Sequence, residues 1–239
     1  MKKEQQKNLS QEEKGILVAI CLGDGCLHKP HPKTKSVQLE IGHSIKQLEY
    51  CTYKRDLVHK ILGAESRIPK LSIRKVKVKG NEYETCRFLK TCDYFIALRK
   101  LLYPHGRKVI TKEILNMLSP EGLAIWYMDD GSCYYKESPV DGHSICIDLR
   151  ISTDCFTSDE HDIMVEYFRT KWNINFYKFY SKTRDVYCLR ANKEAAIKFI
   201  NLIKPYVIPS MQYKIDLKLQ ECETPNKGED IVWTITMVK

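Results

Sequence analysis

Several patterns that would place the chain in a class at once are missing from the sequence. None of its ten cysteines stands in a Cys-x-x-Cys pair, the ligand spacing of most structural zinc sites. No apolar run approaches the ~20 residues that a membrane span needs. The start, MKKEQQKNLSQEE, is basic and polar with no apolar segment behind it, unlike a secretory signal. We therefore expect an intracellular protein that is neither secreted nor bound in a membrane, and that holds no structural zinc.

Positive charge is the first informative property that is present. The 239 residues carry a formal net charge of +9, and 43% of them are apolar. That apolar content is ordinary for a globular protein, and the length suffices for one large domain or two equivalent halves. The charge favours a polyanionic partner, with nucleic acid ahead of an anionic membrane surface.

Two helices with clear starting signals are expected. Ser10-Gln-Glu-Glu13 fits a capping box, which predicts a helix over about 11–23. Serine followed by proline at 119–120 suits an N-cap and a first helical position. Each helix precedes an Asp-Gly pair, so the chain uses the same local design twice.

The ends of these two helices match over nine residues. LVAICLGDG (17–25) and LAIWYMDDG (123–131) align on their final Asp-Gly, which places Asp24 and Asp130 106 residues apart. A turn at Asp-Gly would explain either segment taken alone. Lys108 and Lys214 are also 106 residues apart and follow similar apolar stretches. The shared spacing favours a degenerate internal repeat.

Each half is predicted to run α-β-α-β-β-α, with no Gly/Ser-rich linker between the halves. Strand-like segments at 36–44 and 144–153 precede helix-like segments, and hairpins with basic strands follow. Close packing of the two Asp-Gly helices would bring two carboxylates together, and a divalent cation would relieve their repulsion. Oxygen ligands of this kind favour Mg²⁺.

Basic residues gather on the predicted hairpins. In IRKVKVK (73–79), lysines alternate with valines, so a strand would carry them on opposite faces. A solvated outer face would explain this pattern equally well. The second half repeats it with interleaved tyrosines, and a two-stranded ribbon of this composition suits the major groove of a duplex.

Taken together, these features resemble the LAGLIDADG homing endonucleases of the single-chain, two-motif type. The paired nine-residue helices, the basic halves and the segments GRKVI and MQYKID carry the resemblance over about 10–220. It implies an α+β fold of two pseudo-symmetric α-β-β-α-β-β-α half-domains, with a central helix pair and two saddle-shaped antiparallel DNA-binding sheets. The expected divisions are a tail (1–9), half-domains at 10–116 and 117–222, and an extension (223–239).

The resemblance also implies an activity and a set of site residues. The activity is a double-strand break in a long asymmetric DNA target by a monomeric enzyme of a mobile intron, with Mg²⁺ (or Mn²⁺ in its place) as cofactor. Asp24 and Asp130 would hold the metal together with the backbone of Gly23 and Asp129, and Lys108 and Lys214 would assist catalysis. The implied DNA contacts are Gln38, Arg74, Lys75, Lys77, Lys79, Arg87, Arg150, Lys178, Tyr180, Lys182, Arg184 and Arg190.

Some points stay open at the level of sequence. Gly23 precedes the key aspartate in one half and Asp129 does so in the other, so Asp129 either contributes only its carbonyl or faces away. An RNA maturase for the host intron, with or without DNA cleavage, is the main alternative function. A DNA-binding protein with an inactive site is a third, which retention of both aspartates and both lysines disfavours.

Overall fold

The computed structural model describes residues 8–31, 33–63, 67–137 and 144–215, and the side chains of 135–137 and 144–147 are not described. The expected extension at 223–239 and its possible strand lie outside the described residues.

The chain repeats one order of elements. The first half contains α1 (Gln11–Leu22), β1 (Cys26–His28), β2 (Gln38–Ser44), η1 (Ile45–Gln47), α2 (Leu48–Leu62), β3 (Ser72–Val78), β4 (Asn81–Thr91), α3 (Tyr94–Leu102) and α4 (Lys112–Asn116). The second half contains α5 (Pro120–Asp130), β5 (Gly131–Glu137), β6 (Ser144–Ile151), α6 (Ser158–Trp172), β7 (Phe176–Ser181), β8 (Val186–Asn192), α7 (Lys193–Ile203), η2 (Lys204–Tyr206) and η3 (Pro209–Lys214). The expected order α-β-β-α-β-β-α is confirmed.

The predicted helix starts follow from side-chain caps. Ser10 Oγ accepts a hydrogen bond from the Glu13 N–H at 3.1 Å, and the Ser10 N–H donates to Glu13 Oε2 at 2.8 Å. Ser119 Oγ accepts from the Gly122 N–H at 3.2 Å, with proline at the first position of α5. These caps satisfy amide groups that a helix cannot pair internally.

Each half contains one four-stranded antiparallel sheet. The strand orders are β1-β2-β4-β3 and β5-β6-β8-β7. The residue pattern alone indicates one strand fewer in each half, because the short β1 and the strand β5 lie so close to the preceding helices. Equivalent strands therefore occupy equivalent places, as a two-fold repeat requires.

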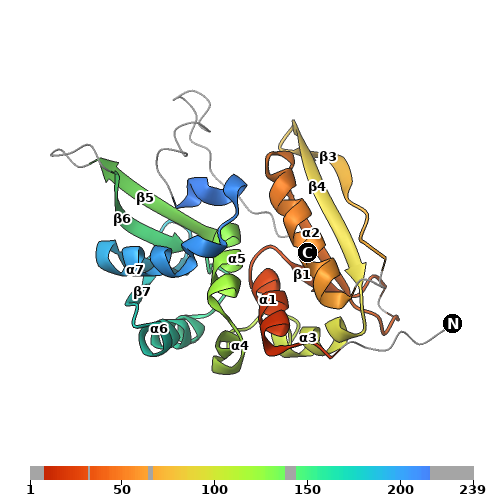
Figure 1. Cartoon of the computed structure of the whole chain (residues 1–239), viewed down its shortest axis with the longest axis horizontal. Coiled ribbons are helices and arrows are strands. Elements are labelled where there is room, and N and C mark those ends of the chain that lie inside the picture. Colours follow the sequence, from red (N-terminus) through yellow and green to blue (C-terminus); the bar gives the residue numbers. More distant parts are fainter. Residues whose placement is uncertain (1–7, 32, 64–66, 138–143, 216–239) are drawn as a thin grey trace.

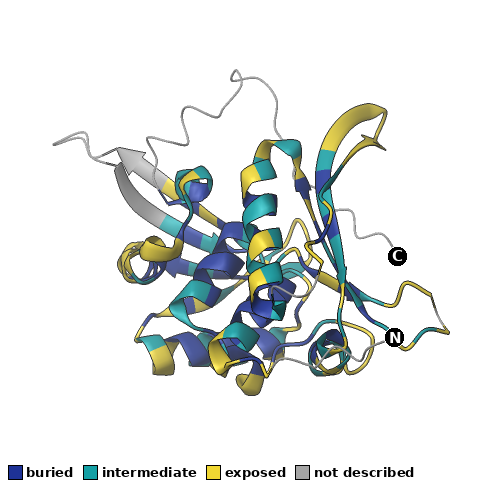
Figure 2. Cartoon of the chain, turned by 45° about the vertical axis from the view of Figure 1, so that its right-hand side comes forward, coloured by how far each residue is buried: buried dark blue, intermediate teal, exposed yellow. Residues whose placement is uncertain are grey.

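The two Asp-Gly helices lie side by side at the centre, with the first half on the right of Figure 1 and the second on the left. A Cβ added to Gly122 would lie 3.5 Å from Ala19 Cβ, and one added to Gly15 would strike the Met117 carbonyl. Small residues thus let the backbones approach. Figure 2 shows this central region as buried, whereas the outer end of the β3–β4 hairpin is exposed.

Both central helices are apolar around most of their circumference. Every residue from Gly15 to Leu22 and from Gly122 to Met128 is buried, as expected of helices that lie between two halves. Within the described ranges, no helix is long and apolar enough to cross a membrane.

Candidate active site and nucleic-acid interface

Asp24 lies just beyond the end of α1, where Gly23 caps the helix by donating to the Ala19 carbonyl at 3.1 Å. Its side chain is 37% exposed, and Oδ2 lies 3.5 Å from His43 Nδ1. Neighbouring residues remove much of the water around the Asp24 carboxylate. This desolvation, and after it repulsion from Asp129, raises the pKa of Asp24 to about 6. A cation bound beside this carboxylate would therefore stabilise its charged form.

Asp130 is the last residue of α5 and receives support from its own helix. Trp126 Nε1 donates to Asp130 Oδ2 at 3.1 Å, and the Ser152 N–H donates to the Asp130 carbonyl at 2.9 Å. Burial and then repulsion from Asp129 and Asp24 raise the pKa of Asp130 to about 8. The two predicted aspartates stand at adjoining helix ends, because the Asp24 N–H donates at 3.0 Å to the side chain of Asp129, the neighbour of Asp130.

Asp129 has a larger role than the sequence suggests. Its carboxylate is fully buried and forms an ion pair with Lys54 of α2, whose side chain is also fully buried. Oδ2 accepts a hydrogen bond from the Asp24 N–H at 3.0 Å. Burial would raise the pKa of Asp129, but the Lys54 charge holds it below its ordinary value. Asp129 therefore does not face away, because the missing side chain of Gly23 leaves room for it between the halves.

The two predicted lysines lie at the ends of the two central helices. Lys108 Nζ donates to the carbonyls of Leu22 and Gly23, each at 3.1 Å. Lys214 Nζ donates to the carbonyl of Asp129 at 3.0 Å. The two carbonyls predicted to bind metal thus accept hydrogen bonds from the lysines. Burial lowers the pKa of Lys214, which makes release of a proton from this amine easier than in water.

A chain of hydrogen bonds joins His43, which lies beside Asp24 in the first half, to Tyr213 in the second half. His43 Nδ1 lies 3.2 Å from Gln47 Oε1, and Gln47 Nε2 donates to Tyr213 Oη at 3.1 Å. Burial, together with the charge of Lys54, lowers the pKa of His43 to about 4. His43 is therefore uncharged at neutral pH, and its Nδ1 faces Asp24.

The chemistry of these donors fits a divalent cation. In the described part of the chain, Asp24, His43 and Asp129 form a group whose ligand atoms lie within 4.8 Å of one another. Carboxylate oxygens are the ligands that Mg²⁺ and Ca²⁺ prefer, and the raised pKa values of Asp24 and Asp130 are relieved when a cation binds. Asp129 in this group is already paired with Lys54, and Asp130 is not one of its members.

Strand register decides which predicted DNA contacts share a face in the first sheet. Ile73 pairs with the buried Cys86, so Lys75 and Lys77 lie on the side that α2 covers. The opposite, open face carries Gln38, Arg74 and Arg87. Lysines and valines do alternate as predicted, but the open face is the valine face.

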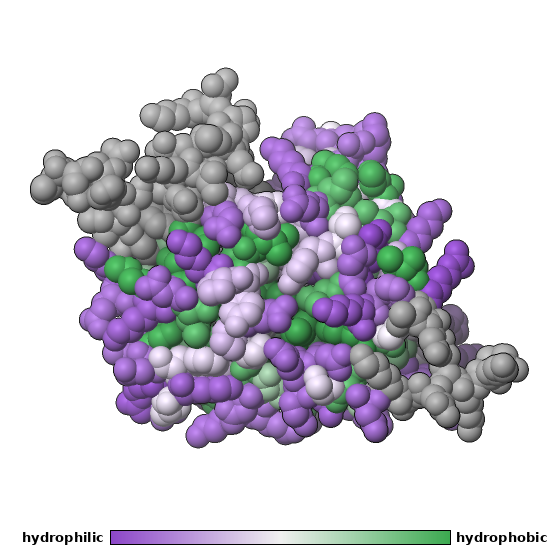
Figure 3. Space-filling model, viewed as in Figure 1, coloured by the Kyte–Doolittle hydropathy of each residue, from purple (hydrophilic) through white to green (hydrophobic). Residues whose placement is uncertain are grey.

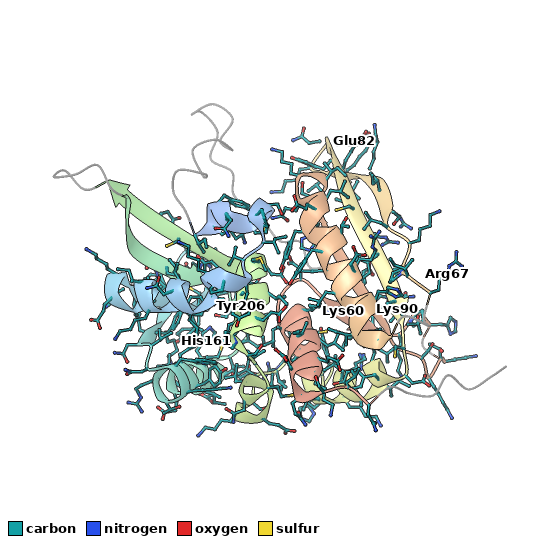
Figure 4. All side chains as sticks on the ribbon, viewed as in Figure 1. Lys60, Arg67, Glu82, Lys90, His161 and Tyr206 are labelled. Atoms are coloured by element: carbon teal, nitrogen blue, oxygen red, sulfur yellow. The ribbon has the colours of Figure 1, made fainter. Side chains whose placement is uncertain are left out.

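The outer end of this hairpin lies far from the central helices. Lys75 Nζ pairs with Glu82 at 2.9 Å, and Figure 4 shows Glu82 at the tip. Lys79 occupies the turn with a left-handed φ of 49°. Hydrophilic residues cover most of the face in Figure 3, with small apolar patches, one of them over this hairpin.

The second sheet divides its predicted contacts in the same manner. Arg150 and Arg190 are direct partners on the open face, where Arg190 pairs with Asp148 and lies over the Phe179 ring at 4.4 Å. Lys178 and Tyr180 share the helix-covered face with the buried Leu189 and its neighbours.

The ion pair of Lys178 and the positions of two further predicted contacts of the second half, Lys182 and Arg184, complete this description. Lys178 Nζ pairs with Asp162 at 2.7 Å at the start of α6, so it is occupied away from the open face. Lys182 is exposed in the β7–β8 turn, and Arg184 pairs with Asp154 at 2.8 Å. The predicted cations therefore do not all share one face of a sheet: Lys75, Lys77 and Lys178 lie on the helix-covered faces, and Arg74, Arg87, Arg150 and Arg190 lie on the open ones.

Sequence reasoning missed Lys54, His43 and Trp126. The sequence holds a signal for Lys54 in the helical spacing of its apolar neighbours. The residues of α2 that are buried are Tyr50, Cys51, Lys54, Val58 and Ile61. This spacing places a lysine inside an apolar stripe, where an unpaired charge would be costly. No comparable pattern marks His43.

Comparisons with known proteins identify the family of this chain. The family model described as "LAGLIDADG DNA endonuclease family" matches residues 14–199. The chain is 28% identical over 210 residues to the cytochrome b mRNA maturase bI2 of Debaryomyces hansenii, covering 87% of this chain and 75% of the maturase. It is 25% identical to a RecA protein of Mycolicibacterium chitae, covering 87% of this chain and 47% of that protein.

Solved structures show the same fold. The homing endonuclease I-WcaI bound to its DNA recognition sequence matches with a TM-score of 0.74 at 24% identity, over 88% of each chain. I-DmoI in complex with DNA and Ca matches with a TM-score of 0.50 at 15% identity, over 81% of this chain and 89% of that one.

Proposed function

We propose that this chain, which belongs to the LAGLIDADG DNA endonuclease family, makes a double-strand break in a long, asymmetric DNA target by metal-dependent phosphodiester hydrolysis. The observation that carries the proposal is the contact between the ends of the central helices, where the Asp24 N–H donates to Asp129, the neighbour of Asp130, and Lys108 and Lys214 donate to carbonyls at those ends. Two such Asp–Lys ends in one chain suit two phosphates on opposite strands, so a monomer suffices.

The proposed chemistry places Asp24 and Asp130 as the carboxylate ligands of a divalent cation, with Mg²⁺ first and Mn²⁺ as a substitute. Such a cation, when bound, neutralises charge on the phosphate and acidifies water. Lys108 and Lys214 are held by backbone carbonyls, so their ammonium groups need no reorganisation to stabilise the charge that develops during hydrolysis. The lowered pKa of Lys214 favours loss of its own proton, and the neutral amine that results can take a proton from the attacking water.

DNA recognition is proposed for the open faces of the two sheets. Arg74, Arg87 and Gln38 supply donors in the first half, and Arg150 and Arg190 do so in the second. Arginine can bind guanine edges or phosphates. The side chains of the two halves differ, which is why the proposed target is asymmetric.

Selection of cleaved sites from a random or genomic DNA library with Mg²⁺ tests this function directly. Asp24→Asn and Asp130→Asn should each abolish double-strand cleavage while DNA binding is retained. Asp159→Asn on the exposed start of α6 is the matched control and should cut at the wild-type rate. Double-strand cutting by either active-site variant would refute the assignment of two carboxylates.

The second candidate is an RNA maturase, which the similarity to the bI2 maturase favours. Tight binding to an intron RNA, together with no cleavage of any DNA in the selected library, would support this function over the first. Cleavage together with RNA binding would support both.

A further inference from the structure

We propose that the Asp129 side chain, held by Lys54, positions the Asp24 half of the site alone, so that loss of the Asp129 hydrogen-bond acceptor converts the enzyme into one that cuts chiefly one strand. The inference rests on the proposed function and goes beyond it, because it assigns different supports to two ends that the repeat makes equivalent.

The first support for this inference is the contact between Asp129 and the Asp24 backbone. Asp129 lies on α5 in the second half, yet its Oδ2 accepts a hydrogen bond from the Asp24 N–H at 3.0 Å. Asp24 lies beyond the last turn of α1 and is flanked by Gly23 and Gly25. The backbone of such a segment has more freedom than the backbone inside a helix. The buried carboxylate therefore fixes the backbone that carries the Asp24 side chain.

Lys54 holds that carboxylate in place. It pairs with Asp129 Oδ1 from α2, and its Nζ lies 4.4 Å from the centre of the Tyr50 ring. Tyr50 lies one helical turn earlier on α2 and donates its hydroxyl to the Ile125 carbonyl of α5 at 3.1 Å. Two residues spaced i, i+4 on α2 thus contact two residues spaced i, i+4 on α5, which fixes one half of the molecule against the other.

Asp130 is supported in a different way. Its carboxylate accepts from Trp126 Nε1 on the same helix at 3.1 Å, and its carbonyl accepts from the Ser152 N–H of the same half. Neither contact uses Lys54 or the Asp129 carboxylate. The Asp129 group that meets the second lysine is its backbone carbonyl, which remains in any side-chain variant.

Two double variants separate the role of the hydrogen bond from that of the charge pair. Lys54→Met with Asp129→Asn removes both buried charges but keeps an amide oxygen that can accept from the Asp24 N–H. Lys54→Met with Asp129→Ala removes the acceptor as well. Neutralising both partners avoids leaving a single buried charge, and thermal unfolding of both variants checks that each remains folded.

Three measurements follow on these variants: exchange of the Asp24 amide in the metal-free protein, affinity for the DNA target without metal, and the cleavage rate of each strand from end-labelled DNA. In the alanine variant we expect amide exchange and the ratio of strand cleavage rates each to change by about tenfold, the factor for loss of one ordinary hydrogen bond. The asparagine variant should keep both within about threefold of wild type. DNA affinity should be equal in the two.

Equal loss of both strand activities in the alanine variant, or equal behaviour of the two variants, would overturn the proposal. If the wild-type chain cuts no DNA, the proposed function fails, whereas the exchange rate of the Asp24 amide still decides whether Asp129 positions that residue.

Discussion

Replacing Gly23 with alanine should destabilise the protein, because a Cβ at this position meets the buried Asp129 side chain. The added atom would lie 2.6 Å from Asp129 Cβ and 2.7 Å from Cγ, and closer still to Oδ2. The carboxylate cannot retreat without leaving Lys54 and the Asp24 N–H. The substitution therefore forces a choice between overlap and a broken ion pair.

The expected cost follows from these two routes. Overpacking a well-filled core costs about 1–3 kcal/mol, and breaking a buried ion pair costs about 3–5 kcal/mol. The protein will adopt the response that costs less free energy, so we expect the free energy of unfolding to fall by about 3 kcal/mol. For a protein of this length, each kcal/mol lowers Tm by about 2–4 °C, which predicts a fall of about 6–12 °C.

Calorimetry or circular dichroism measures this fall, and Gly42→Ala is the matched control. A Cβ on Gly42 would find its nearest neighbour, Arg87 Cβ, at 3.7 Å, so that variant should change the free energy of unfolding by less than about 1 kcal/mol. Adding Gly23→Ala to Asp129→Gly should cost almost nothing, since the clashing side chain is gone. The same loss in both backgrounds would refute the reasoning.

Three further predictions concern the metal, Asp130 and the DNA interface. The pKa values of Asp24 (about 6) and Asp130 (about 8) are raised, so the metal-free fold keeps protons that the unfolded chain releases. The stability that these bound protons contribute is lost as pH rises from about 4 to 8. Ca²⁺ should therefore raise Tm more at pH 8 than at pH 5, and an equal rise at both would contradict ligation by these carboxylates. Trp126→Phe removes the donor to Asp130 and should slow cleavage of the strand that loss of the Asp129 side chain spares. Cleavage rates measured for each strand test this, and equal slowing of both strands would count against separate supports for Asp24 and Asp130. Arg74→Ala should reduce the slope of log affinity for DNA against log salt by about one if Arg74 contacts a phosphate, whereas Lys75→Ala, on the other face of the sheet, should leave that slope unchanged; the reverse result would show that the lysine face meets DNA.

Much of the fold could be predicted from the sequence because its signals are local. The capping box at Ser10 fixes the start of α1, and the serine–proline pair fixes the start of α5. The repeated Asp-Gly ends reveal the two halves without any knowledge of long-range contacts. The spacing of Lys108 and Lys214 likewise reports a symmetry that the structure contains.

The faces of the sheets could not be assigned from alternation alone. Alternation shows that Lys75 and Val76 point to opposite sides, but only pairing with β4 shows which side faces the helix. Ile73 pairs with the buried Cys86, which puts the lysines on the covered side and Arg74 on the open one. A shift of register by one residue would have exchanged these faces.

The departure from symmetry at the centre is where sequence and structure inform each other most. An exact repeat would place the same residue before each key aspartate, and two facing acids there would repel at full burial. Gly23 in one copy and Asp129 in the other remove that conflict, because one copy supplies a side chain and the other supplies the space for it. Lys54 then supplies the opposite charge from α2 alone. The two ends of the site consequently have equivalent carboxylates and lysines but different supports, and this difference is why we expect the Asp129 and Trp126 variants to affect the two strands unequally.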